Sequence, residues 1–153
     1  MNLIDIKKLI ISTVASGVGM WIVAGLWHNI IMQALYKETH ATHEGIGIML
    51  IAYLVLGLLM AYMYPLGYKG GKPILEGLRF GIIIGILWVF PHDLSMIGLP
   101  NIPSIVYIFK NVTWHIFEQG IGGIIIGLIY GKINESVKAT ELQKIKNLND
   151  RNI

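Results

Sequence analysis

Two long stretches without a charged side chain constrain this chain more than any other feature of its sequence. Residues 9–36 and residues 45–68 contain no Asp, Glu, Lys or Arg, which makes runs of 28 and 24 residues. A helix of roughly 20 apolar residues crosses the hydrocarbon core of a bilayer, which is about 30 Å thick. Charged residues make up 14% of the chain, whereas soluble proteins carry about 25%. The sequence therefore excludes soluble enzymes, nucleic-acid-binding proteins and disordered chains, and it predicts an integral membrane protein.

The hydrophobic stretches predict an all-α fold, an antiparallel bundle of four transmembrane helices within residues 1–131. Pro65 is expected to end the second helix, because proline has no amide hydrogen and interrupts the helical hydrogen bonds. The mixed-charge residues 132–153 are expected to form a frayed helical tail in the cytoplasm. We expect the four spans at about residues 9–36, 45–64, 74–92 and 106–131.

The basic residues predict how the bundle is oriented. Ten of the 12 Lys and Arg residues flank one end of the predicted bundle, and the other end has Lys37 and Lys110. Because short loops rich in Lys and Arg stay in the cytoplasm, both termini are predicted to be cytoplasmic, in a multi-pass protein of the plasma (inner) membrane. The ten are Lys7, Lys8, Lys69, Lys72, Arg79, Lys132, Lys138, Lys144, Lys146 and Arg151.

Six glycines predict where two helices approach most closely. Three of them repeat every four residues on the third predicted helix, and three do so on the fourth. Small residues at this spacing form a groove that lets helix backbones come close, which matters because lipid tails provide no hydrophobic drive for helix association. The two grooves are expected at the same depth and facing each other. The glycines are Gly77, Gly81, Gly85, Gly123, Gly127 and Gly131.

The ionisable residues inside the spans gather in the half of the bundle away from the basic loops. His115 and Glu118 are three residues apart on the fourth helix, a spacing at which both side chains reach one partner. With His28 and His92 they provide the ligand types of a metal or haem site. A structural polar network and a proton-coupled or substrate-binding pocket are the alternatives. We expect His115 and Glu118 to point into the bundle, near His28 or His92, because a charged group facing lipid at mid-membrane costs about 2.5–3.5 kcal/mol.

Two segments carry a resemblance to a family. EGLRFGIIIGILWVFPH (residues 76–92) and WHIFEQGIGGIIIGLIYGK (residues 114–132) resemble a broad class of uncharacterised small four-helix prokaryotic inner-membrane proteins. A glycine-rich third helix and a fourth helix that is first polar and then glycine-rich recur in that class. The resemblance covers the second half of the chain; it implies the fold, and it implies no activity and no residue role.

Three classes of function are compatible with these residues. The first is a non-catalytic membrane protein in contact with lipid and with other membrane subunits, as an accessory subunit or a homo-oligomer; the absence of a catalytic motif and the small-residue grooves favour it. The second is a metal- or haem-binding protein in electron transfer, which rests on His28, His92, His115 and Glu118. The third is a small transporter or lipid-pocket protein, which is disfavoured because the spans are unbroken except near Pro91 and contain no carboxylate pair.

Overall fold

The computed structural model describes residues 5–32, 43–68, 70–97 and 105–149, and this part of the chain is built from helices. Helix α1 spans Ile6–Leu26 and leads into a short π-helix, η1, at Trp27–Met32. Helix α3 spans His43–Gly67, α4 spans Pro73–Ser95 and α5 spans Ile105–Asn149. The four segments long and apolar enough to cross a membrane are Ile6–Ile30, Gly45–Gly67, Pro73–Ser95 and Ile105–Gly131. The predicted all-α bundle of four candidate membrane spans is confirmed.

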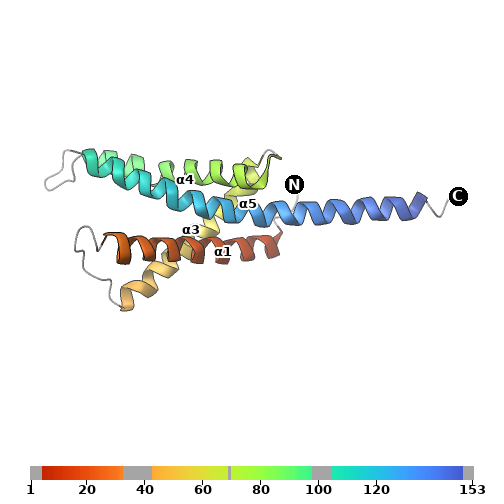
Figure 1. The fold of residues 1–153 in the computed structure, drawn as a ribbon, viewed down its shortest axis with the longest axis horizontal. Helices are drawn as coiled ribbons and strands as arrows, with labels where there is room; N and C mark the ends of the chain where they lie inside the picture. The colour runs from red at the N-terminus through yellow and green to blue at the C-terminus, as the bar shows by residue number, and fades with distance from the viewer. Residues whose placement is uncertain (1–4, 33–42, 69, 98–104, 150–153) are drawn as a thin grey trace.

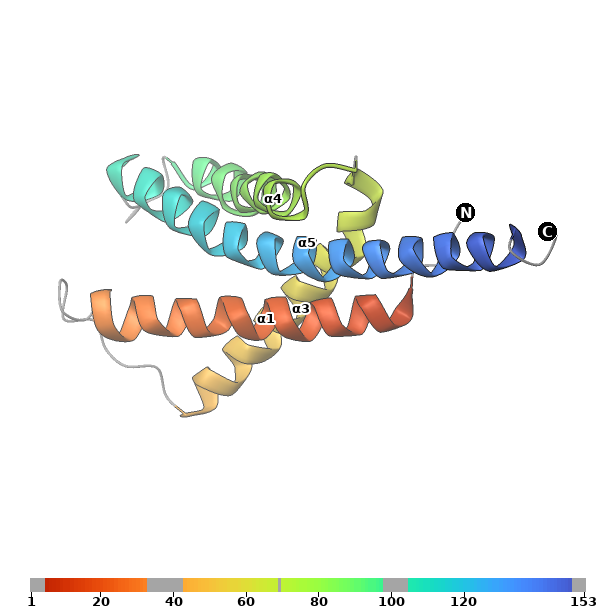
Figure 2. The same cartoon turned by 45° about the vertical axis from the view of Figure 1, so that its right-hand side comes forward.

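The four helices are not arranged symmetrically. α4 and α5 lie side by side, α1 runs along the other side of α5, and α3 crosses the bundle obliquely (Figures 1 and 2). The first residues of α3 therefore diverge from the other helices, while its last turns reach the beginning of α4. This oblique crossing decides which part of α3 packs against the chain and which part does not.

The contact between α4 and α5 is the most extensive in the bundle, and glycine makes it close. A methyl group added at Gly85 would lie 2.7 Å from the carbonyl oxygen of His115, and one added at Gly123 would lie 2.8 Å from the amide nitrogen of Gly81. Backbone atoms therefore face backbone atoms across the contact. The structure places all six glycines of the sequence pattern here: Gly77, Gly81, Gly85, Gly123, Gly127 and Gly131.

A second close approach joins α1 to α3 and has no glycine triplet in the sequence. A methyl group at Gly57 would lie 2.7 Å from the carbonyl oxygen of Thr13, and one at Gly17 would lie 2.9 Å from that of Tyr53. The hydroxyl of Ser16 donates to the carbonyl oxygen of Ser12 at 2.6 Å, so this polar side chain is satisfied within its own helix. One glycine from each helix fixes where the two helices cross.

Pro65 does not end α3, contrary to the sequence prediction; the helix continues to Gly67. A proline at this position lacks the amide that would bond to the carbonyl of Ala61, four residues earlier. The phenolic hydroxyl of Tyr130, on α5, donates to that carbonyl at 3.0 Å, and this hydrogen bond is buried. Another helix thus satisfies the acceptor that proline leaves open, and this lowers the cost of proline inside the helix.

We expect Tyr130→Phe to lower the free energy of unfolding by about 0.5–1.5 kcal/mol, because the Ala61 carbonyl then loses its donor. The same substitution should cost less in a Pro65→Ala background, since the alanine amide can restore the bond within α3. Unfolding in bicelles, followed by circular dichroism, measures both costs. An equal cost in the two backgrounds would contradict this role of Tyr130.

The remaining differences from the sequence prediction lie at the helix ends. The first helix was expected to reach Tyr36, but α-helical geometry ends at Leu26, and residues 33–36 lie outside the described part. α4 continues past His92 to Ser95, whose hydroxyl donates to the His92 carbonyl at 2.7 Å. α5 passes Gly131 and continues as one helix to Asn149, which at 1.5 Å per residue carries it about 27 Å further.

Candidate functional site

Glu118 is fully buried, with 0% of the residue exposed. Among the residues whose side chains the structure describes, the other acidic residues, Asp5, Glu76 and Asp93, all retain some exposure. Glu118 lies on α5 more than three turns from the start of that helix. A polar group buried without hydrogen bonds is costly, and a charged one more so, so the partners of this carboxyl group decide what it can do.

Three side chains hydrogen-bond to the carboxyl group of Glu118. The phenolic hydroxyl of Tyr53 donates to Oε1 at 2.5 Å, and Nε2 of Gln119 donates to Oε2 at 3.0 Å. Nδ1 of His115 lies 3.1 Å from the same Oε2, with the ring tautomer that carries a proton on Nδ1 as the donor. Tyr53 comes from α3 and the other three residues from α5. These four residues, the Glu118 cluster, therefore join α3 to α5 inside the membrane.

Both residues of the predicted His115/Glu118 pair take part in the cluster, but the wider metal set is not assembled. His92 is exposed and lies beside Asp93, with Nδ1 of the ring 3.4 Å from Oδ1 of the carboxyl group. His28 is exposed and meets the ring of Trp114 edge-on, at 6.4 Å between centroids. Among the described residues, no three His, Asp or Glu side chains are grouped so that they could hold a metal ion. Of the four residues predicted to bind a metal, His28, His92, His115 and Glu118, the structure pairs His115 with Glu118.

The direction of the side chains explains why His28 and His92 are not grouped with this pair. Spacing on one helix placed His115 and Glu118 correctly, but His28 and His92 belong to other helices whose rotation the sequence does not define. In the structure His92 turns to its neighbour Asp93, whose Oδ2 accepts a hydrogen bond from Nδ2 of Asn111 at 2.8 Å. This separate polar contact joins the end of α4 to the first turns of α5.

Aromatic packing holds η1 against α5 in the same half of the bundle. The rings of Trp27 and Trp114 are stacked, with centroids 4.3 Å apart and planes at 14° to each other. Phe117 packs against Trp114 from the next turn, at 5.9 Å between centroids. α5 is therefore joined to α1 through η1 by aromatic rings, to α3 by the Glu118 cluster, and to α4 by glycine.

Tyr53 and Gln119 were not identified from the sequence as partners of Glu118. Tyrosines of membrane proteins concentrate at the two interfaces, but Tyr53 lies ten residues inside α3, in the middle of an uncharged run. A tyrosine hydroxyl at that depth needs a polar partner. This requirement was the feature of the sequence that could have pointed to Tyr53 as a partner of Glu118. Gln119 is 1% exposed, and within the described part of the chain its Oε1 has no hydrogen-bond partner.

Comparisons with known proteins add no assignment: no family model, no curated protein and no solved structure matches this chain. The resemblance to small four-helix inner-membrane proteins stays a prediction. Both oxygens of Glu118 accept hydrogen bonds from the protein's own side chains, an arrangement that fixes the relative position of two helices.

Proposed function

We propose that this protein is a non-catalytic membrane subunit that acts by assembling with other membrane helices, as an accessory subunit or as a homo-oligomer. The observation that carries this proposal is the closed arrangement of the Glu118 cluster, in which both carboxyl oxygens are bonded within the chain. A catalytic metal site keeps a coordination position open for substrate or water. A buried carboxyl group whose two oxygens both accept hydrogen bonds from the chain instead fixes how the helices pack.

The surface we assign to assembly is the open face of α3. In the most apolar window of each helix, 17% of α3 is buried within the chain, against 44% of α5. Exposed side chains recur on α3 at alternating intervals of three and four residues, which is the pattern of a left-handed helix–helix seam. These residues, the α3 stripe, are Ile48, Ile51, Val55, Leu58 and Tyr62, each at least 44% exposed.

A second copy of the chain is a suitable partner for the α3 stripe. The stripe carries no charge, so two copies can pack face to face about a twofold axis without burying an unpaired charge. The oblique crossing of α3 also moves its first turns away from the rest of the bundle (Figure 2), which leaves room for another helix to approach. Both features support assembly through α3.

The orientation that we propose places the protein in the inner membrane with both termini in the cytoplasm. α1 and α4 begin at the same end of the bundle, α3 ends there, and α5 extends beyond it (Figure 1). Lys7, Lys8, Lys72 and Arg79 belong to this end and Lys110 to the opposite one. Because basic residues are retained on the cytoplasmic side, this distribution supports the orientation.

Cross-linking through one introduced cysteine tests assembly through α3, since the chain has no cysteine of its own. We expect Val55→Cys to form a covalent dimer when purified protein is oxidised in phosphatidylcholine vesicles at a low protein-to-lipid ratio. Leu87→Cys is the matched control, because Leu87 is also an exposed apolar residue, 62% exposed, but lies on α4. Equal dimer yields from the two variants would mean random collision and would contradict assembly through the α3 stripe.

A further inference from the structure

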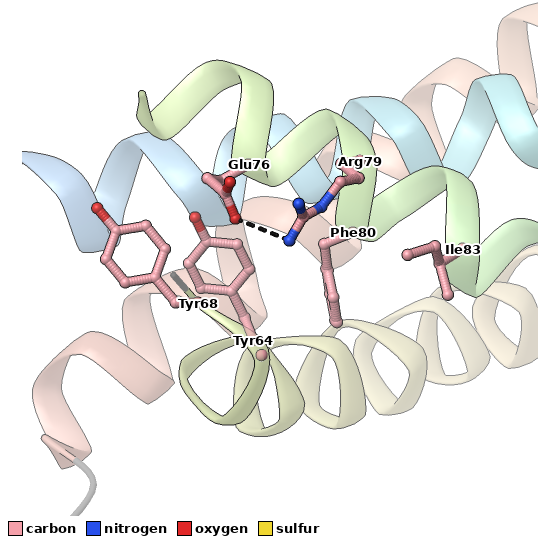
Figure 3. A pocket seen from close by; sticks show the side chains of 7 residues that line it. Tyr64, Tyr68, Glu76, Arg79, Phe80 and Ile83 are labelled. Carbon is pink, nitrogen blue, oxygen red and sulfur yellow. Dashed lines mark hydrogen bonds and ion pairs between the residues drawn. The ribbon is translucent and has the colours of Figure 1, made fainter. Parts of the chain in front are cut away.

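A small cleft opens between the last turns of α3 and the first turns of α4, at the basic end of the bundle (Figure 3). Its volume is about 100 Å³, well above the roughly 10–15 Å³ that one water requires. None of the residues that line this cleft belongs to the Glu118 cluster or to the α3 stripe. The residues that line it are Tyr64, Gly67, Tyr68, Glu76, Arg79, Phe80 and Ile83.

The polar groups of the cleft are the ion pair between Arg79 and Glu76 and, beside it, the hydroxyl of Tyr64. A guanidinium nitrogen of Arg79 lies 3.2 Å from a carboxyl oxygen of Glu76, and the side chain of Arg79 is 52% exposed. Tyr64 is 2% exposed, and among the described residues its hydroxyl has no hydrogen-bond partner. Figure 3 shows this hydroxyl pointing to the start of α4, where Glu76 lies. A buried hydroxyl without a partner is costly, and a ligand in the cleft would supply one.

The apolar part of the cleft is ordered by depth. Tyr64 packs edge-on against Phe80, at 5.4 Å between centroids, and lies against Tyr68 at 5.7 Å. Glu76 is in the first turn of α4, whereas Ile83 lies seven residues further along the helix, about 10 Å deeper at 1.5 Å per residue. The lining therefore changes from charged at the membrane surface to apolar towards the membrane interior, as a phospholipid does from headgroup to acyl chain.

We propose that this cleft binds a phospholipid with a phosphoethanolamine headgroup. The phosphate bonds to Arg79, whose guanidinium matches phosphate oxygens well. The ammonium group donates hydrogen bonds to the carboxyl group of Glu76 and to the hydroxyl of Tyr64, and the aromatic rings attract its positive charge. An acyl chain follows Phe80 and Ile83 into the membrane.

The charges of the cleft select this headgroup over two common alternatives. Glu76 repels a purely anionic headgroup such as phosphatidylglycerol, which brings a phosphate and no ammonium group. Phosphatidylcholine brings a positive charge, but its quaternary nitrogen has no hydrogen to donate to Glu76 or to Tyr64. A primary ammonium next to a phosphate satisfies Glu76, Arg79 and the Tyr64 hydroxyl together.

Native mass spectrometry of the full-length protein tests this proposal. The protein is released from nanodiscs that contain equal amounts of phosphatidylethanolamine, phosphatidylglycerol and phosphatidylcholine with the same acyl chains, and the retained lipid is identified. We expect phosphatidylethanolamine to be retained about fivefold over phosphatidylcholine, which corresponds to one charged contact of about 1 kcal/mol at a membrane surface.

Variants then separate the contributions of Arg79, Glu76 and Tyr64 to lipid binding. Arg79→Gln should lower retention of all three lipids about fivefold, while the matched Lys110→Gln, at the other end of the bundle, should not. Glu76→Gln should remove the preference for phosphatidylethanolamine over phosphatidylglycerol. Tyr64→Phe should weaken retention of phosphatidylethanolamine more than that of phosphatidylcholine, with the exposed Tyr107→Phe as its control.

Each contrary result overturns the assignment. Equal retention of the three lipids means that the cleft does not distinguish between the headgroups. Preferential retention of phosphatidylglycerol that depends on Arg79 and not on Glu76 assigns the cleft to anionic lipid instead. A phosphatidylethanolamine preference that survives both Arg79→Gln and Glu76→Gln places the lipid elsewhere on the protein.

Discussion

Gly81→Leu is expected to separate α4 from α5 and to abolish the folded bundle. A methyl group at Gly81 alone would lie 2.7 Å from the Cα atom of Gly120, and leucine adds three further carbons to it. The atoms in the way belong to a helix backbone, which cannot rotate aside as a side chain can. Overpacking of a core costs about 1–3 kcal/mol when side chains yield, and occasionally more. We expect Gly81→Leu to exceed that range, as measured by unfolding in bicelles.

A matched pair of alanine variants separates two effects on stability: the close backbone contact, and the low helix propensity of glycine relative to alanine. Gly47, on α3, has no atom within 4 Å of the position of an added methyl group. Gly47→Ala should therefore stabilise the protein by about 0.5–1 kcal/mol, because alanine favours the helix. Gly81→Ala should have the opposite sign. If both variants stabilise, glycine is not needed for the approach of α4 to α5.

Glu118→Ala is expected to lower the free energy of unfolding by about 3 kcal/mol, because it leaves Tyr53, His115 and Gln119 without their acceptor. Each buried donor that loses its partner costs roughly 1–3 kcal/mol, less where water reaches it. Glu118→Gln should cost less, since its amide oxygen still accepts from Tyr53. Asp93→Ala serves as the control, because the contact of Asp93 with Asn111 is only partly buried. A cost of Glu118→Ala no larger than that of Asp93→Ala would contradict a central role for the cluster.

The sequence predicts the spans well because a charge-free run of apolar residues has few alternatives in a membrane protein. It predicts the end of the second helix wrongly because the effect of Pro65 depends on a distant residue. Tyr130 lies 65 residues further along the chain and supplies the donor that the helix lacks. Local rules describe the cost of proline, and the tertiary structure decides whether that cost remains.

The candidate site was predictable to the extent that it lies on one helix. The spacing of His115 and Glu118 fixes their relative position through helix geometry alone. Tyr53 joins them because α1 and α3 cross at Gly17 and Gly57, which sets the tilt of α3 across the bundle. Residue types on separate helices, such as His28 and His92, do not reveal which way each side chain points, and the metal hypothesis depended on that direction.

A double-mutant cycle between Tyr53 and Glu118 tests most directly whether the cluster holds α3 against α5. The unfolding free energies of Tyr53→Phe, Glu118→Ala and the double variant are compared with that of the unaltered protein in the same bicelles, because each single variant removes the hydrogen bond between the two side chains. An intramolecular hydrogen bond contributes about 0.5–1.5 kcal/mol, so we expect a coupling energy of about 1 kcal/mol. A coupling within about 0.3–0.5 kcal/mol of zero, the range found for independent sites, would contradict the account.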